Sequence, residues 1–271
     1  MNLNDQIAVI TGGGSGMGAG AASVLAAQGV TTCLLGRRLQ VLENTAANVG
    51  GSAFRCDVSD PEALDAVFDA IENRLGTPRI LVHAAATGSM PPLLIGRGEA
   101  SPREALREII ETNVLGTLYA NQVFAERLSR IERMEDGLRG LIVNVSSIGA
   151  LDGIVGSSYV TSKAAVNGLC LSLARELSGY GIRVMTIAPG GIDTPMFREG
   201  ANEATYDLIA STVPALERVG TPREFGELVR HICENDYLNG SIIRLDGGMR
   251  IPFVKNVGKD TAGLEQADQS A

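Results

Sequence analysis

The sequence is poor in the side chains that usually bind metals or form disulfides. Among 271 residues there are no tryptophans, two histidines and four cysteines. The cysteines are far apart and form no CxxC pair, so we expect buried, reduced thiols rather than a disulfide framework or a zinc site. They are Cys33, Cys56, Cys170 and Cys233. No His, Cys or carboxylate cluster has ligand spacing, and we expect no metal. His83 is predicted to be a structural hydrogen-bonding residue at a strand end, and His231 a surface residue.

The chain also lacks an excess of positive charge and any long apolar run. It contains 23 Lys and Arg against 31 Asp and Glu, a formal net charge of −8. This charge argues against nucleic acid or an anionic membrane as the main partner, because phosphates bind to basic surfaces. No run approaches membrane-spanning length, and the first residues do not resemble a leader peptide. We therefore expect a cytoplasmic protein with no membrane partner.

Short β-branched runs alternate with amphipathic runs along the chain. Strands are predicted at residues 7–10, 31–35, 54–57, 80–85, 141–145, 183–187 and 241–245, and the first two helices at 19–28 and 39–48. This alternation predicts an α/β fold, namely a Rossmann-type doubly wound parallel sheet of about seven strands with helices on both faces. Without a repeat or a linker, residues 1–253 are predicted to form one domain, followed by a polar C-terminal tail at 254–271.

A glycine-rich turn at residues 11–18 follows the first predicted strand and opens the first helix. In that context Gly12 permits a sharp turn, Gly16 lets a pyrophosphate approach the backbone, and Gly18 lets the helix pack closely. Ser15 and Met17 lie between these glycines. The N–H groups and partial positive charge of a helix N-terminus suit phosphates, so this turn is predicted to bind a dinucleotide.

The second predicted strand ends without the acid that usually holds the ribose hydroxyls of NAD. Gly36 takes the place of that acid, and Arg37 and Arg38 follow. A guanidinium can pair with a 2′-phosphate, which favours NADP(H). NAD stays possible, because the arginines are also compatible with solvated loop charges. Asp57 and Val58, at the end of the third predicted strand, are placed to meet the adenine.

A tyrosine and a lysine four residues apart begin a later predicted helix. Tyr159 and Lys163 would lie on one face of that helix. A phenol with a pKa of about 10 is a poor base at neutral pH, and an adjacent ammonium moves that pKa toward the working range. Such a pair can therefore act in general acid/base catalysis. The buried stripe of the helix is predicted at Val166, Leu169, Leu173 and Leu177.

Taken in order, these motifs resemble the short-chain dehydrogenases/reductases. Three more belong to the series: Asn113 within ETNVLGT, the serines of NVSSI, and APGGIDT at 188–194. The resemblance runs from about residue 3 to residue 252, and several motifs agree in both order and spacing. It implies an NAD(P)-dependent oxidoreductase that interconverts a secondary alcohol and a ketone.

The resemblance also implies a role for each matching residue. Tyr159 is the general acid/base, Lys163 lowers its pKa and holds the nicotinamide ribose, and Asn113 anchors a water relay behind Lys163. One serine polarises the substrate oxygen. Alignment of the strand selects Ser147, whereas the usual distance to the tyrosine selects Ser146. We choose Ser147, because a one-residue deletion is easier in the loop than in the strand.

Two further segments match the cofactor site of the family, one of them with a departure. Ile192 and Thr194 are implied to contact the nicotinamide amide and the phosphates. After the fourth predicted strand the family usually has Asn-Asn-Ala-Gly, where residues 83–86 read His-Ala-Ala-Ala. Ala84 and Ala85 continue the backbone path over the adenosine, without the side-chain support of an asparagine.

The loops after the later strands are apolar, which favours an aliphatic, aromatic or steroid-like alcohol or ketone over a polyol. Their apolar residues are those at 90–95 together with Ile148, Leu151, Met196 and Phe197. Residues 181–190 and 237–252 resemble members of the family that oxidise 3-hydroxyacyl-CoA or hydroxysteroids. With NADPH, a 3-oxoacyl thioester or carbonyl reductase is an equal alternative.

Two further expectations concern the oligomeric state of the protein and whether it is an active enzyme. The family resemblance implies a homotetramer or homodimer whose interface includes the long catalytic helix and residues 238–253. An inactive scaffold that binds the cofactor is the alternative from another class. The intact Tyr159, Lys163 and Asn113 argue against it, because a scaffold does not need a cation beside a tyrosine.

Overall fold

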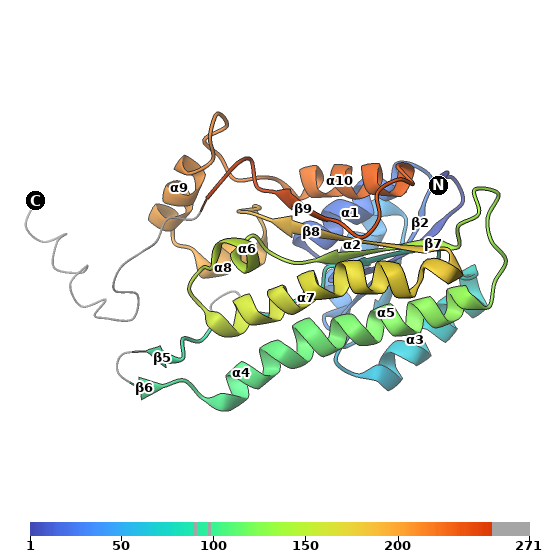
Figure 1. Cartoon of the computed structure of the whole chain (residues 1–271). Helices are drawn as coiled ribbons and strands as arrows, with labels where there is room; N and C mark the ends of the chain where they lie inside the picture. Colours follow the sequence, from blue (N-terminus) through green and yellow to red (C-terminus); the bar gives the residue numbers. More distant parts are fainter. Residues whose placement is uncertain (89–90, 97–98, 251–271) are drawn as a thin grey trace, which may run out of the picture.

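Seven parallel strands form the central sheet of this computed structural model, which describes residues 1–88, 91–96 and 99–250 (Figure 1). They lie in the order β3-β2-β1-β4-β7-β8-β9. Their bounds are β1 (Ile7–Thr11), β2 (Thr31–Gly36), β3 (Ser52–Arg55), β4 (Ile80–His83), β7 (Gly140–Val145), β8 (Ile182–Pro189) and β9 (Ile242–Leu245). The chain runs outward from β1 to β3 and then outward again from β4, so the predicted doubly wound fold is confirmed. Ligands of such sheets bind where the strand order reverses, here between β1 and β4.

Helices cover both faces of the sheet (Figure 1). One face carries α1 (Gly16–Ala26), α2 (Leu39–Val49) and α10 (Pro222–Glu234), and the other carries α3 (Pro61–Leu75), α5 (Gly116–Ser129) and α7 (Ser157–Glu176). Shorter elements follow the carboxyl ends of the strands. They are β5 (Ile95–Gly96), β6 (Glu99–Ala100), α4 (Arg103–Ile110), α6 (Gly149–Asp152), α8 (Pro195–Gly200) and α9 (Glu203–Ser211), whereas η2 (Ser178–Tyr180) lies between α7 and β8.

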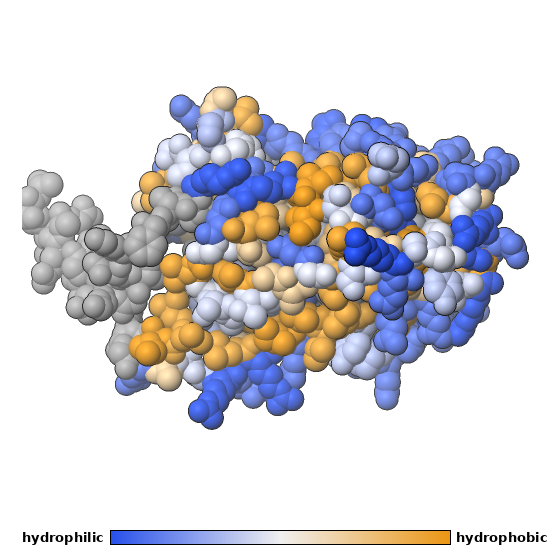
Figure 2. All heavy atoms as spheres, in the orientation of Figure 1, coloured by the Kyte–Doolittle hydropathy of each residue, from blue (hydrophilic) through white to orange (hydrophobic). Residues whose placement is uncertain are grey.

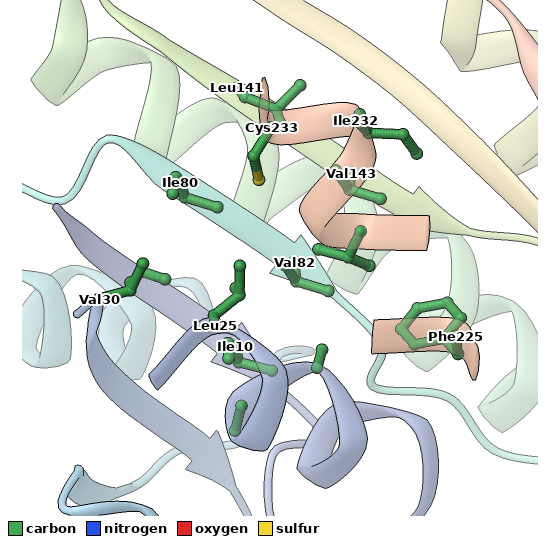
Figure 3. Packing of buried hydrophobic residues seen from close by; sticks show 14 of the residues in the cluster. Ile10, Leu25, Val30, Ile80, Val82, Leu141, Val143, Phe225, Ile232 and Cys233 are labelled. Carbon is green, nitrogen blue, oxygen red and sulfur yellow. The ribbon is translucent and has the colours of Figure 1, made fainter. Parts of the chain in front are cut away.

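Alternate residues of each strand point to opposite faces of the sheet and belong to two separate hydrophobic cores. Ile10, Val82 and Val143 pack toward α1 and α10, where Figure 3 shows them with Phe225. Their neighbours in sequence point to the opposite face, against α3, α5 and α7. Burying an aliphatic or aromatic side chain contributes about 1.5–3 kcal/mol, so these two layers supply most of the stabilisation of the sheet. The helices α1 and α10 cross at Gly20, where a Cβ would lie 2.1 Å from a carbonyl oxygen of α10.

Two predicted elements begin more than one residue from their expected starts, and the fourth strand ends at His83 rather than at residue 85. The first helix begins at Gly16 rather than Ala19, because Ser15 serves as its N-cap inside the glycine turn. The third strand is Ser52–Arg55 rather than 54–57, since its register with β2 starts at Ser52 and Asp57 already turns the chain. The predicted tail at 254–271 and the last three residues of the predicted domain lie outside the described residues.

The buried stripe of α7 was also predicted incorrectly in part. Val166 and Leu177 are buried as expected, but Leu169 and Leu173 are only half-buried. The face against the sheet is completed by two smaller side chains, Cys170 and Ala174. Cys170 and Ala174 follow Val166 at intervals of four residues, so they continue the line of side chains that packs against β8.

Candidate active site

The glycine-rich turn leaves the N-terminus of α1 open. Gly12 and Gly16 have φ of +65° and +53°, and a Cβ on Gly12 would lie 2.9 Å from the backbone of Ala84. A Cβ on Gly18 would lie 2.3 Å from the carbonyl oxygen of Gly12, so only glycine lets the helix start against the turn. The N-cap hydroxyl of Ser15 makes no capping hydrogen bond, and the first turn carries no acidic residue. The unpaired N–H groups and the helix dipole therefore suit a phosphate.

The carboxyl end of β2 presents two arginines next to a glycine. Arg37 and Arg38 are exposed and line the same cavity as the glycine turn. A Cβ on Gly36 would make only an ordinary contact with a leucine side chain, at 3.6 Å, so packing does not require glycine here. Burial raises the pKa of the nearby Asp57 carboxyl, but hydrogen bonds from Ser59 and the charge of Arg37 outweigh it and hold this pKa below its ordinary value.

A cavity of about 500 Å³ brings together nearly all the residues predicted to hold the cofactor. It is lined by Gly12, Ser15, Gly16, Met17, Gly18, Arg37, Asp57, Val58, Ala84, Ala85 and Thr194. Thr112 and Glu199, which sequence reasoning did not identify, also line it. The cavity is lined by Arg37 and Arg38, by the first turn of α1, and by Tyr159 and Lys163. The residues present therefore fit a nicotinamide dinucleotide.

Tyr159 and Lys163 project from the first two turns of α7. The buried ammonium of Lys163 donates a hydrogen bond of 2.9 Å to the carbonyl oxygen of Val145 and lies 5.9 Å from the centre of the Tyr159 ring. Burial lowers the pKa of Lys163 to about 8. Burial raises the pKa of Tyr159, and a hydrogen bond with the side chain of Ser147 offsets part of this rise. In this arrangement one N–H of the Lys163 ammonium is directed to Val145, and the lowering of the Tyr159 pKa by Lys163 that the resemblance implies stays a prediction.

The two serines after β7 have different partners. Ser146 is buried, and its hydroxyl donates a hydrogen bond of 2.9 Å to the main-chain carbonyl of Lys163. The side chain of Ser147 is a hydrogen-bond partner of Tyr159, and its oxygen accepts a bond of 3.0 Å from the N–H of Gly149. This geometry supports Ser147 as the serine that meets a substrate oxygen.

Asn113 lies in a π-helical turn, η1 (Glu111–Leu115), that joins α4 to α5. Its amide nitrogen donates to the carbonyl of Thr87 at 3.1 Å and to the hydroxyl of Ser162 at 3.0 Å. Its side-chain oxygen accepts from the N–H of Thr87 at 2.9 Å. Ser162 in turn donates to the carbonyl of Tyr159 at 2.7 Å, so Asn113 ties the loop after β4 to the first turn of α7. Sequence reasoning missed Thr87 and Ser162, although Ser162 stands inside the YVTSK motif.

His83 ends β4 inside the protein, beside Thr11 of β1. Its Nδ1 lies 3.1 Å from the Thr11 hydroxyl, which accepts a hydrogen bond of 3.1 Å from the N–H of Ala85. Thr11 and His83 thus support the backbone of residues 84–86, where an asparagine is usual in the resembling family. The structural role predicted for His83 is confirmed, and His231 is exposed as predicted.

A second cavity of about 470 Å³ adjoins the first. Both are lined by Met17, Gly88, Ser146, Tyr159, Thr194 and Met196. Tyr159 therefore stands where the two cavities meet. None of the described residues that line the second cavity carries a charge. This cavity is suited to a neutral, apolar molecule.

The walls of the second cavity agree in part with the predicted apolar loops. Ile148, Met196 and Phe197 line it, as do Pro91 and Ile192. Leu94 and Ile95 do not, since they are 60% and 66% exposed beside the β5–β6 hairpin, and Leu151 is also exposed. Met90 lies outside the described residues. The walls that were not predicted include Ile154, Val155, Leu208, Ile209, Thr212 and Met249.

An ion pair anchors α6, the short helix that follows the serines. Arg244 of β9 makes two hydrogen bonds to Asp152, of 2.7 and 2.8 Å, and one of 2.7 Å to Asp246. The side chains of Asp152 and Asp246 are only 15% and 8% exposed. The loop that carries Ser147 is therefore fixed to the last strand of the sheet. No sequence pattern indicates this pair, whose members are 92 residues apart.

Known proteins resemble the chain over nearly its whole length. A family model described as enoyl-(acyl carrier protein) reductase matches residues 12–250. The 3-hydroxyacyl-CoA dehydrogenase type-2 of Bos taurus is 35% identical over 254 residues, which cover 92% of this chain and 97% of that protein. The 3-oxoacyl-[acyl-carrier-protein] reductase of Mus musculus is 32% identical over 250 residues, covering 91% and 99%.

A solved structure gives the same result. The crystal structure of 3-hydroxyacyl-CoA dehydrogenase type-2 from Mycobacterium avium superposes with a TM-score of 0.84 at 30% identity, over 91% of this chain and 96% of that chain. Within the part of the chain that the structure describes, no helix is long and apolar enough to cross a membrane. The chain belongs to the short-chain dehydrogenase/reductase family, whose members are oxidoreductases that act on CH–OH groups with NAD(H) or NADP(H).

Proposed function

We propose that Tyr159, Ser147 and Lys163 interconvert a secondary alcohol and a ketone on a neutral, apolar substrate. The observation that carries this proposal is the position of Tyr159, which lines both the cofactor cavity and the apolar cavity. Alcohol oxidation removes a hydride from carbon and a proton from oxygen, so the proton acceptor has to stand beside both sites. The nicotinamide cofactor supplies or accepts the hydride when bound.

The side chains of the protein handle the proton and the substrate oxygen. The Ser147 oxygen accepts a hydrogen bond from Gly149, so its O–H is the donor that pairs with Tyr159 and can turn to the substrate oxygen. Tyr159 gives its proton to that oxygen during reduction and takes it back during oxidation. The Lys163 ammonium stabilises the phenolate left on Tyr159. Asn113 acts indirectly, by holding the start of α7 through Ser162.

The cofactor is proposed to be NADP(H) in preference to NAD(H). Arg37 and Arg38 line the cavity, and neither makes an ion pair with a carboxylate among the described residues. Gly36 offers no carboxylate to a ribose hydroxyl. A 2′-phosphate therefore meets two guanidinium groups beside the carboxylate of Asp57, whereas a ribose hydroxyl of NAD finds no acceptor at residue 36.

The substrate is proposed to be an aliphatic, aromatic or steroid-like alcohol or ketone, or the acyl part of a 3-hydroxyacyl thioester. The uncharged walls of the second cavity support this class and disfavour polyols. Two of the relatives are named as a 3-hydroxyacyl-CoA dehydrogenase and a 3-oxoacyl-[acyl-carrier-protein] reductase. An NADP(H) preference favours the reductive direction, as a 3-oxoacyl thioester or carbonyl reductase.

The assembly is proposed to be a homotetramer or homodimer. Figure 2 shows a band of apolar residues over the face that carries α7, and Leu171 of this helix is 49% exposed. The edge strand β9 has no partner on its outer side among the described residues, and its Ile242 is 38% exposed. Light scattering at micromolar concentration tests this proposal, and a monomer would contradict it.

A substrate panel tests the proposed reaction. The purified protein is assayed with 3-oxoacyl thioesters, steroid ketones and aryl ketones, with both NADPH and NADH, and with a sugar ketone as the polar control. We expect turnover of at least one apolar ketone and none of the sugar. Cofactor binding without turnover of any apolar ketone, or a preference for the sugar, would contradict the proposal.

A further inference from the structure

Four polar side chains form a row across the middle of the sheet. The strand register pairs Thr11 with His83, His83 with Asn144, and Asn144 with Thr186. All four are at most 2% exposed. The residues two positions earlier on each strand are apolar and pack against α3, α5 and α7; they are Val9, Leu81, Ile142 and Val184. The polar row therefore faces the same helices, one step nearer to the carboxyl ends of the strands and to the catalytic residues.

The hydrogen bonds of Thr11 assign the tautomer of His83. The Thr11 hydroxyl accepts from the N–H of Ala85 and also pairs with Nδ1 of His83. A hydroxyl has one proton to donate, and for this buried Thr11 the available acceptor is Nδ1. Nδ1 is thus the acceptor, and the imidazole carries its proton on Nε2. His83 therefore presents an N–H donor to the interior.

The row holds more polar atoms than the described residues satisfy. Nε2 of His83, both polar atoms of the Asn144 amide and the hydroxyl of Thr186 are buried without a hydrogen-bond partner there. An unsatisfied buried polar atom destabilises the fold, and native proteins commonly satisfy such groups with internal water. Because His83 and Asn144 are adjacent on neighbouring strands, their side chains provide donors and an acceptor at one place.

Lys163, next to this row, has ammonium N–H groups that are not used in hydrogen bonds to the described residues. An ammonium has three N–H groups, and Lys163 uses one of them on the carbonyl of Val145, which directly follows Asn144. Its charge, together with burial, lowers the pKa of His83 to about 3, burial being the larger cause. His83 is therefore neutral at working pH, and it adds a dipole beside Lys163 without adding a second positive charge.

We infer that His83 and Asn144 bind an internal water molecule that supports the ammonium of Lys163 from the side of the sheet, which makes His83 a positioning residue for Lys163. The water accepts hydrogen bonds from Nε2–H of His83 and from Lys163, and it donates to the amide oxygen of Asn144. This restores part of the hydration that Lys163 loses on burial, so the ammonium stays protonated to higher pH. The part that concerns catalysis rests on the proposed role of Lys163.

Few other titratable groups bear on Lys163. Burial is the cause of its lowered pKa, with no contribution from another charge among the described residues. Tyr159 is the titratable group that α7 itself presents to it, and His83 is the one from β4. The other neighbouring elements, β1, β7 and η1, present the neutral Thr11, Asn144 and Asn113.

A crystal structure and a spectrum test the water site independently of any activity. At high resolution we expect a water within hydrogen-bond distance of His83 Nε2 and of the Asn144 amide. In the ¹⁵N spectrum of labelled protein we expect the Nε2–H tautomer of His83 at neutral pH. A dry site or the Nδ1–H tautomer would overturn the inference, whatever Tyr159 and Lys163 are found to do.

Three variants test the support of Lys163, with the pH profile of alcohol oxidation as the readout. His83→Leu removes the donor at similar volume, His83→Gln keeps a side-chain N–H, and Thr186→Val removes a polar group two strands away in the same row. Without the water Lys163 loses its proton at lower pH, so the phenol of Tyr159 is less acidic. The rate of alcohol oxidation should increase with pH as Tyr159 loses its proton. We expect His83→Leu to move the midpoint of this increase upward by about 0.5 pH unit or more. KM for the alcohol should change less than about threefold.

The two other variants separate positioning from packing. His83→Gln should recover at least half of the shift, and Thr186→Val should keep the parental midpoint. A parental profile in His83→Leu would overturn the support of Lys163. The same is true if His83→Gln behaves like His83→Leu, or if Thr186→Val shifts the midpoint as far. If His83→Leu does not fold, His83→Gln against Thr186→Val and the crystallographic water decide the matter.

Discussion

The hydroxyl of Ser146 donates a hydrogen bond of 2.9 Å to the main-chain carbonyl of Lys163, which joins the end of β7 to α7. Both serines line the apolar cavity, but the side chain of Ser147, the next residue, pairs with Tyr159 instead. Adjacent serines of the same chemical type therefore have different surroundings. One is engaged within the protein, and the other is available to a substrate.

The two serines are expected to respond differently to replacement by alanine. Ser147→Ala should lower kcat by about 100-fold with little change in Tm, because it removes a donor to the substrate oxygen. Ser146→Ala should cost about 1 kcal/mol of stability and less than tenfold in kcat, since it removes a buried hydrogen bond. Steady-state kinetics and thermal unfolding on both variants check this. A larger loss of kcat in Ser146→Ala would reverse the assignment.

The cofactor preference should follow Gly36 and Arg37. We expect kcat/KM with NADPH to exceed that with NADH by about tenfold or more, because a charge-assisted contact is worth about 1.5–3 kcal/mol. The double variant Gly36→Asp with Arg37→Leu should move the preference toward NADH. A Cβ at residue 36 has room, so Gly36→Ala is a clean control that should keep the parental preference.

The measurement is kcat/KM for both cofactors on one accepted ketone at fixed ionic strength, because salt screens the phosphate contact. A parent enzyme that favours NADH, or that does not discriminate, would show that Arg37 does not bind the 2′-phosphate.

Lys163→Met is expected to stabilise the cofactor-free protein in a pH-dependent way. The folded-state pKa of about 8 lies below the ordinary value of 10.5. Below pH 8 both folded and unfolded chains carry the proton, and the buried charge destabilises the fold. Between pH 8 and 10.5 the folded state releases the proton first, so parental stability rises with pH.

The stabilisation by Lys163→Met should therefore be largest near pH 7, about 1–2 kcal/mol after the lost bond to Val145 is counted, and should shrink toward pH 10.5. Denaturant unfolding of parent and variant across this range provides the measurement. A difference that is the same at every pH would contradict the burial of a charged Lys163.

Arg244→Met should disturb the loop of the catalytic serine from a distance. It leaves the partly buried carboxylates of Asp152 and Asp246 without their main partner, at a cost of about 2–3 kcal/mol. The residues directly after α6 line the apolar cavity, so a displaced α6 would disturb this wall. We therefore also expect KM for the ketone to rise. Arg250→Met is the control, since Arg250 is 63% exposed and has Asp246 as its one carboxylate partner among the described residues. Equal losses in the two variants would contradict the anchoring role of Arg244.

Local motifs predicted most of the fold and of the cofactor cavity. The glycine turn at 11–18 and the Tyr159–Lys163 pair are local because the geometry they require, a tight turn before a helix and two side chains on one helix face, is set by near neighbours in sequence. The doubly wound parallel sheet followed from the regular alternation of strands and helices. Because the turn before the helix is also a local feature, the predicted start of α1 was only three residues from the observed start at Gly16.

Pairings between distant segments could not be predicted in this way. No local pattern shows that Thr11 meets His83, that Arg244 meets Asp152, or that Leu208 closes the apolar cavity. Hydrophobicity alone also misplaced part of the buried face of α7, where the small Cys170 packs inward and Leu173 stays half-exposed. Which apolar residue is buried depends on the surface opposite, and that surface comes from elsewhere in the chain.

The kinetics of Tyr159→Phe with the accepted ketone test the central claim most directly. The substitution removes one hydroxyl at the junction of the two cavities and keeps the ring. We expect kcat to fall by about 10²–10⁴-fold, the usual contribution of general acid/base catalysis, while the Kd for NADPH changes less than about threefold. Turnover within threefold of the parent would contradict the account, because the proton would then be carried by another group.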